Sequence, residues 1–268
     1  MAQVRNGPVV SASGPFAFLR LGIATPVLTA GLLACLFSVS ARPALAWGNQ
    51  GHRITALFAD TLLTPRTRAR VHELSGALSL AELANWADEN RSGLTVLLDK
   101  SDQWHYDNRP VCNASAPIAS YCPDGQCASA ALKSFEATLR DRSATIDQRN
   151  IALRYLVHVL GDIHQPLHVG DNGDAGGNKL NVSVDGKPPR NLHSWWDSGF
   201  LQQMMRGFSE QGYAAGLREW YQNDIADWQR GSEQDWMNES YAILTQHTYG
   251  DLPGFRCGTP PAFVTPLS

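Results

Sequence analysis

The sequence predicts a mostly α-helical protein with one domain, built as a helical bundle with a small hairpin. Helix start and stop signals recur along the chain from residue 64 onward. Only Leu180–Val184, which ends at Asp185-Gly186, has the pattern of a hairpin strand. No internal repeat, heptad run or linker interrupts the chain of 268 residues, so one domain is the simplest expectation.

The helices can be placed from their capping residues. Thr64-Pro65 supplies an N-cap followed by proline at the first helical position, and Gly76 can end that helix. Ser79-Leu80-Ala81-Glu82 is a capping box that opens a helix to about Asn90. A second capping box, Thr145–Gln148, opens a long helix that is apolar on nearly every face, so we expect it at the centre of the bundle. Further helical stretches are expected at 126–142, 194–206, 209–222 and 233–247.

Residues 1–46 have the pattern of a signal peptide. No charged residue occurs from Leu21 to Ala41, and Ala44-Leu45-Ala46 is an A-x-A cleavage signal. Two alternatives stay open: a transmembrane anchor, because about 20 apolar residues can span a bilayer, and a lipoprotein cut before Cys35. We expect cleavage between Ala46 and Trp47, which leaves residues 47–268 as an exported periplasmic or extracellular domain.

The charge balance argues against a protein that binds duplex DNA through a basic surface. Residues 1–46 contain three arginines and no acidic residue; removing those three from 22 basic residues leaves 19 against 25 acidic ones, a net charge of −6. Duplex binding depends on many contacts between Lys or Arg side chains and phosphates. Any phosphate must therefore be held by something other than a basic surface.

Four cysteines follow residue 46, an even number that suggests two disulfides in an exported protein. Cys122 and Cys127 flank a Pro-Asp-Gly turn in a short loop, so we expect them to pair. Cys112 is then left to pair with Cys257. A thiolate zinc site is disfavoured because neither pair has C-x2-C spacing.

Histidines and aspartates recur in apolar surroundings. His158 and Asp162 are four residues apart on one face of the long helix, and His193 and Asp197 repeat that spacing. A buried carboxylate is costly unless it is paired or coordinated. Imidazole and carboxylate ligands together suit zinc, and the lack of thiolates indicates a catalytic site. The candidates in this set also include Asp88, His105 and His168, whereas His72, His164 and His247 are left out.

Several short motifs occur in a specific order. They are Trp47-Gly48-x-x-Gly51-His52, Trp86-Ala87-Asp88 with Arg91, Trp104-His105-Tyr106, His158-x3-Asp162-x5-His168, Gly176-Gly177-Asn178 and His193-x3-Asp197. Each motif is weak alone, but their joint order and spacing resemble the S1/P1 nuclease family, zinc enzymes related in fold to bacterial zinc phospholipase C. The resemblance implies a helical bundle of the phospholipase C/P1 nuclease type.

The resemblance also implies three zinc ions and a ligand set for each. The first would be held by Asp88, His105, His158 and Asp162. The second would be held by His168, His193 and Asp197. The third would be held by His52, by Asp162 as a bridge, and by Trp47 through its free α-amino nitrogen and its carbonyl oxygen. This last chelate exists only after cleavage at Trp47, which is why that site is favoured over Cys35.

The implied function is an endonuclease that hydrolyses phosphodiester bonds of single-stranded DNA and RNA to 5′-phosphorylated products, with activity on 3′-nucleotides. Zinc lowers the pKa of bound water to about 7 and so supplies hydroxide near neutral pH. Asp88 would orient the attacking water and Arg91 would neutralise charge on the phosphate. Tyr106 would stack on a base, and Asn108 and Asn178 would contact base or ribose. We expect a monomer with no stable protein partner.

Two alternatives come from other classes of function. One is a zinc phospholipase C on the same scaffold, although those enzymes carry Glu where this chain has Asp197. The other is a zinc-binding or storage protein without catalysis, which would leave Arg91 and Tyr106 unexplained.

Overall fold

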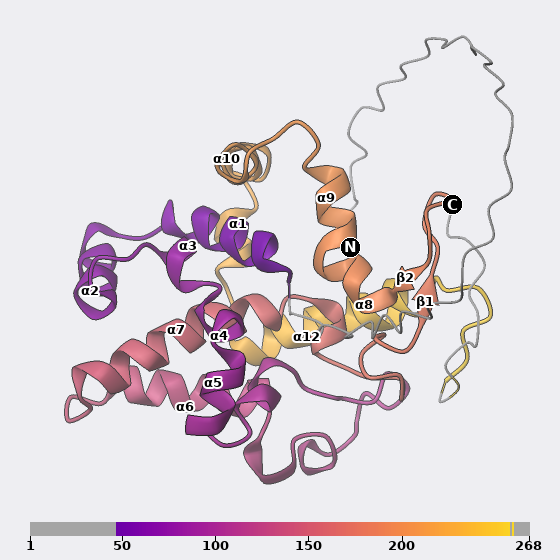
Figure 1. Ribbon diagram of the computed structural model, residues 1–268, viewed down its shortest axis with the longest axis horizontal. Coiled ribbons are helices and arrows are strands. Elements are labelled where there is room, and N and C mark those ends of the chain that lie inside the picture. Colours follow the sequence, from indigo (N-terminus) through magenta and orange to yellow (C-terminus); the bar gives the residue numbers. More distant parts are fainter. Residues whose placement is uncertain (1–46, 258, 260–268) are drawn as a thin grey trace, which may run out of the picture. The chain divides into compact units, whose positions relative to one another are not determined.

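The computed structural model describes residues 47–257 and Thr259. The predicted signal peptide, with its cleavage signal and Cys35, lies outside the described residues. Among those that are described, no helix combines the length and hydrophobicity needed to cross a bilayer. The predicted mostly helical architecture with one small hairpin is confirmed (Figure 1).

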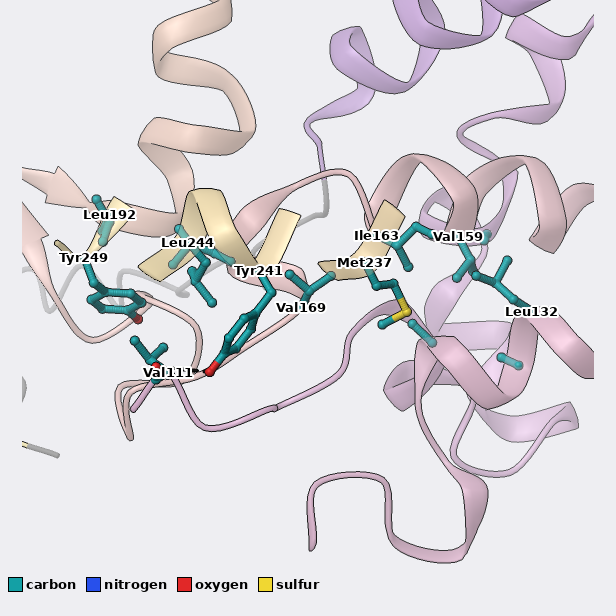
Figure 2. Packing of buried hydrophobic residues seen from close by; sticks show 14 of the residues in the cluster. Val111, Leu132, Val159, Ile163, Val169, Leu192, Met237, Tyr241, Leu244 and Tyr249 are labelled. Carbon is teal, nitrogen blue, oxygen red and sulfur yellow. Dashed lines mark hydrogen bonds between the residues drawn. The ribbon is translucent and has the colours of Figure 1, made fainter. Parts of the chain in front are cut away.

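The long central helix is α7, Ile146–Asp162, and it begins at the predicted capping box. Helix α6 (Ala128–Arg140) packs along it, and α1, α2, α3 and α4 also contact it. Its inward positions include Tyr155 and Val159, which are almost fully buried. Figure 2 shows Val159 and Ile163 continuing a row of apolar side chains toward Met237 and Val169. The polar positions His158 and Asp162 on this same helix are therefore enclosed by the core.

The N-terminal part of the bundle consists of short helices. They are α1 (Asn49–Asp60), α2 (Pro65–Ser75), α3 (Leu80–Leu83), α4 (Trp86–Glu89) and α5 (Arg91–Leu97). Helix α2 begins and ends as predicted, because the Thr64 side chain accepts from the Thr67 N–H and Gly76 adopts a positive φ of 72°. Helices α1 and α5 are not among the predicted helices.

The prediction of one helix from Ser79 to Asn90 is wrong. The chain forms α3, breaks at Ala84 and Asn85, and resumes as α4. At the break the Ala84 carbonyl accepts a 2.6 Å hydrogen bond from Nδ1 of His158 on α7. A tertiary contact at this carbonyl accompanies the break, which a local capping signal cannot reveal.

The hairpin is shorter than the predicted strand. Strand β1 (Asn181–Val182) pairs antiparallel with β2 (Arg190–Asn191), and Val182 lies opposite Arg190. The single-turn segments before it are η1 (Ser101–His105), η2 (Ile118–Ser120), η3 (Pro123–Gly125) and η4 (Pro166–His168). The hairpin leads directly into α8 (Leu192–Ser194), whose N-cap is Asn191.

The predicted helices 194–206 and 233–247 each contain a π-helical turn. In the first, η5 (Trp195–Gly199) lies between α8 and α9 (Phe200–Met204). In the second, η6 (Leu244–Thr248) follows α12 (Glu233–Ile243). The remaining helices are α10 (Glu210–Trp220), which falls within the predicted 209–222, and α11 (Ile225–Trp228). The turn η5 matters for the site because it carries Asp197.

Two disulfides are present, as the sequence predicts. Cys122 joins Cys127 across the short loop, and Cys112 joins Cys257, 145 residues further along. The second bond ties the C-terminal region to the middle of the chain.

Candidate metal centre

Eight buried histidine and aspartate side chains from seven different elements converge in the structure. None is more than 8% exposed. They form three groups in which the potential ligand atoms all lie within 4.8 Å of one another. The members are His52 on α1, Asp88 on α4, His105 on η1, His158 and Asp162 on α7, His168 on η4, His193 on α8 and Asp197 on η5.

The first group contains Asp88, His105 and His158. Nδ1 of His105 lies 3.0 Å from Nε2 of His158. Oδ1 of Asp88 lies 3.7 Å from the His105 nitrogen and 3.6 Å from the His158 nitrogen. The three donor atoms therefore face one point, as the ligands of one ion do.

Asp162 connects this group to a second one. Its Oδ2 lies 3.1 Å from Nδ1 of His105 and 3.3 Å from Nε2 of His158. Its Oδ1 faces the other way and lies 3.2 Å from Nε2 of His52. One carboxylate thus presents a separate oxygen to each of two groups, which is the geometry of a bridging ligand.

The third group contains His168, His193 and Asp197. The two Nε2 atoms are 3.0 Å apart, and Oδ2 of Asp197 lies 3.4 Å from Nε2 of His193. The i, i+4 spacing of His193 and Asp197 holds across the junction of α8 and η5.

Backbone carbonyls fix the orientation of three of the histidines. Nδ1–H of His158 donates to the Ala84 carbonyl, 2.6 Å away. In the same way, Nδ1–H of His168 donates to the His105 carbonyl (2.7 Å) and Nδ1–H of His193 to the Gly176 carbonyl (2.6 Å). Each ring therefore leaves its Nε2 lone pair free for a metal. Such outer partners set the tautomer and the direction of metal-binding imidazoles.

Gln165 is a part of the site that the sequence analysis missed. Its side chain is fully buried, and its Nε2 donates a 2.6 Å hydrogen bond to Oδ1 of Asp197. Its Oε1 accepts from the Leu167 N–H, 2.6 Å away. Gln165 thereby directs the other oxygen of Asp197 toward the histidines. Nothing in the local sequence around Gln165 indicates this contact, because Asp197 is 32 residues away.

The protonation of these groups fits metal binding. Burial lowers the pKa of His52 and of His193 to about 4, so both imidazoles are neutral near pH 7. Burial also raises the pKa of the Asp162 and Asp197 carboxyls well above the usual range. A nearby cation would offset the cost of burying these carboxylates in their charged form.

Several buried polar atoms in these groups have no hydrogen-bond partner. They are Nε2 of His52, Oδ1 of Asp162 and both carboxylate oxygens of Asp88. Buried polar atoms are nearly always satisfied, so unsatisfied ones call for an explanation. Neutral imidazoles and carboxylates with unsatisfied donor atoms fit a divalent metal such as zinc.

Glycine and Trp47 shape the region around His52. A Cβ on Gly161 would lie 2.8 Å from Nδ1 of His52, so only glycine lets α7 approach this ring. The Gly48 N–H donates a 2.9 Å hydrogen bond to the Asp197 carbonyl, which holds the start of the described chain beside the third group. The Trp47 side chain packs over Gly51.

Arg91 lies beside the first group. Its Nη1 is 3.9 Å from Oδ1 of Asp88, and its Nη2 donates a 2.9 Å hydrogen bond to the Asp102 carbonyl. The side chain is 21% exposed, so it connects the buried group with solvent.

The three predicted substrate-binding residues differ in exposure. Tyr106 is half-buried directly after His105, and Asn108 is exposed. Asn178 is half-buried and its Nδ2 donates to the Ala175 carbonyl, 2.8 Å away. Positive φ angles in this turn occur at Ala175, Gly176 and Gly177 and not at Asn178, so the asparagine is not required for the turn conformation. The excluded residues His72, His164 and His247 are all exposed.

The sequence of this chain is similar to those of known nucleases. The sequence profile of the family described as S1/P1 Nuclease matches residues 47–258. Nuclease P1 of Penicillium citrinum is 34% identical over 168 residues, which cover 60% of this chain and 60% of the relative. Nuclease S1 of Aspergillus oryzae is 31% identical over 169 residues, 61% of this chain and 57% of the relative. Endonuclease 3 of Arabidopsis thaliana is 30% identical over 179 residues, which cover 62% of this chain and 58% of the relative. The chain spans about 60% of the length of the curated relatives it matches.

Proposed function

The chain belongs to the S1/P1 nuclease family, and from that premise we propose that it is a zinc-dependent endonuclease acting on single-stranded DNA and RNA. The observation that carries the proposal is the placement of Asp162, whose two oxygens face two different groups of potential metal ligands. The products would be 5′-phosphorylated, and 3′-nucleotides would also be substrates.

The proposed ligands are those named by the family resemblance. Asp88, His105, His158 and Asp162 would hold one zinc, and His168, His193 and Asp197 another. His52, Asp162 and the α-amino nitrogen and carbonyl oxygen of Trp47 would hold the third. When bound, zinc supplies a Lewis acid for the phosphate oxygens and lowers the pKa of water to about 7.

The protein's own groups then position the reactants. Asp88, whose carboxylate oxygens have no hydrogen-bond partner, can accept a hydrogen bond from a water molecule and so orient that water toward phosphorus. Arg91 is aimed at the same place by its bond to the Asp102 carbonyl, so its guanidinium can contact a phosphate oxygen as negative charge increases there. The positive charge of Arg91 thus offsets, at the site itself, the repulsion between a phosphate and this acidic protein.

Single-stranded substrates are favoured by the surroundings of the first group. Tyr106 follows His105 directly and offers a half-buried ring on which an unpaired base can stack, a contact that tolerates different bases. Asn108 and the Oδ1 of Asn178 are available to base or ribose. In a duplex the bases are already stacked and paired, so they could not reach such a ring.

Export is supported by the two disulfides, which form and persist in oxidising compartments. We propose that residues 1–46 are a signal peptide and that residues 47–268 are the mature nuclease domain. Cleavage before Trp47 would release the α-amino group that the third metal site needs.

The test compares substrates on one homogeneous preparation that begins at Trp47. Single-stranded DNA, RNA, a matched duplex and a lecithin emulsion are incubated with wild-type protein and with the Asp162→Asn variant. Rapid cleavage of the single strands by wild-type protein only, with 5′-phosphate ends, is expected. Hydrolysis of lecithin without cleavage of nucleic acid would show a phospholipase, and bound zinc without any turnover would show a storage protein.

A further inference from the structure

Asp174 is a buried carboxylate that the proposed chemistry does not use. It is 0% exposed and lies between η4 and β1, outside the three groups of potential metal ligands. Burying a carboxylate is costly unless its oxygens accept hydrogen bonds. The donors that bind Asp174 therefore indicate its role in the structure.

These donors come from two distant parts of the chain. Oδ1 of Asp174 accepts a 2.6 Å hydrogen bond from the Tyr249 hydroxyl and a 2.8 Å hydrogen bond from the Gly177 N–H. Tyr249 directly follows η6 and is fully buried, and Figure 2 shows its ring among residues of the main hydrophobic cluster. One carboxylate oxygen thus ties the turn at Gly177 to the C-terminal part of the core.

The turn that Asp174 holds is the turn that orients His193. Oδ1 of Asp171 accepts from the Gly176 N–H, 2.8 Å away, so the two aspartates together bind the N–H groups of both glycines. The carbonyl of Gly176 in turn accepts a 2.6 Å hydrogen bond from Nδ1 of His193. A continuous series of contacts therefore runs from Tyr249 through Asp174 and the turn to a proposed zinc ligand.

The turn also has little room to move. Gly176 and Gly177 have positive φ angles of 60° and 78°. A Cβ on Gly176 would lie 2.8 Å from the Leu167 carbonyl oxygen, and one on Gly177 would lie 3.2 Å from Cβ of Leu192. Because Leu167 lies on η4 and Leu192 on α8, the turn packs against the two elements that carry the histidines of the third group.

We infer that Tyr249 and Asp174 are positioning residues for the third group: they fix the Gly176 carbonyl and, through it, the direction in which His193 presents its Nε2. The inference rests on the proposed zinc site of His168, His193 and Asp197. Loss of an outer partner of a metal ligand typically lowers metal affinity 10- to 100-fold. Because Tyr249 acts through Asp174, we expect the lower end of that range for its hydroxyl.

The experiment compares Tyr249→Phe with Tyr241→Phe in the mature protein without nucleic acid. Each variant loses one hydroxyl from a buried ring of the same cluster, but the Tyr241 hydroxyl donates to the carbonyls of Pro110 and Val111. Competition with a chelator should show one of three zinc ions bound about tenfold more weakly in Tyr249→Phe and none in Tyr241→Phe. Imidazole nitrogen spectra should show a change at Nδ1–H of His193 and none at Nδ1–H of His158. Unchanged zinc affinity in Tyr249→Phe, or equal losses in both variants, would overturn the inference.

A double variant tests whether the hydroxyl acts through Asp174. Asp174→Leu removes the acceptor of both hydrogen bonds and should weaken the same zinc at least as much as Tyr249→Phe. Adding Tyr249→Phe to it should cause no further loss, whereas fully additive losses would refute the connection. If Asp174→Leu does not fold, Tyr249→Phe against Tyr241→Phe still decides. Wild-type protein that binds zinc but cleaves no nucleic acid would refute the proposed function and leave this inference standing.

Discussion

Nδ1 of His168 donates a 2.7 Å hydrogen bond to the backbone carbonyl of His105. The two residues belong to different groups of the metal centre, so the ring of one is oriented by the backbone of the other. A shift of η1 would therefore disturb the third group as well as the first.

The purified mature protein should contain close to three zinc ions, one for each group of ligands. Chelation should abolish nuclease activity and lower the melting temperature, because the buried Asp162 and Asp197 carboxylates lose their compensating cations. Elemental analysis and thermal denaturation with and without chelator measure both. Active protein with one zinc or none would rule out the trinuclear arrangement.

Asp162→Asn should impair the protein more than Asp197→Asn. Asp162 faces two groups, whereas Asp197 faces only His168 and His193, which remain in its variant. Zinc content and turnover should both be lower in Asp162→Asn than in Asp197→Asn. Greater loss in Asp197→Asn would refute a bridging Asp162.

One extra residue before Trp47 should impair turnover far more than Trp47→Phe. An added glycine turns the α-amine into an amide, which is a poor zinc ligand at neutral pH, while Trp47→Phe retains the amine and the carbonyl. Mass spectrometry must verify each N-terminus before zinc and activity are compared. Full zinc content and normal rates in the extended protein would show that the N-terminus is not a ligand.

Gln165→Leu should reduce zinc affinity or activity by about 10- to 100-fold, the usual effect of losing an outer partner of a ligand. The change leaves Oδ1 of Asp197 and the Leu167 N–H without their partner. Gln202→Leu, at an exposed position on α9, is the matched control. Competition with a fluorescent chelator measures the affinity, and similar values for the two variants would exclude this role of Gln165.

Gly161→Ala should displace the His52 ring and selectively weaken the site that contains it. The new Cβ would lie 2.8 Å from Nδ1 of His52, closer than such contacts allow. Gly93→Ala on α5 has open space around it and should be neutral or stabilising, by up to about 1 kcal/mol. Loss of about one zinc in the first variant only is expected; unchanged zinc content would mean that the ring adjusts without cost.

Local sequence signals predicted the regular parts of the fold well. The capping boxes at Ser79 and Thr145 and the N-cap at Thr64 all form as expected, because each uses atoms only three residues apart. The break at Ala84 could not be predicted, because the partner of its carbonyl is His158, 74 residues away. The same reason applies to Gln165, whose function depends on a contact with Asp197.

The disulfide between Cys112 and Cys257 has a consequence for resistance to proteolysis. It closes a covalent ring that contains five of the eight clustered side chains, those from His158 to Asp197. A single cut anywhere inside this ring, for example in the exposed stretch 221–224, leaves the two fragments covalently joined. Such a nicked chain would run as one band on a gel without reductant and as two with it. If the protein is exported as proposed, a protease can cut it once within the ring and every proposed ligand stays on one molecule.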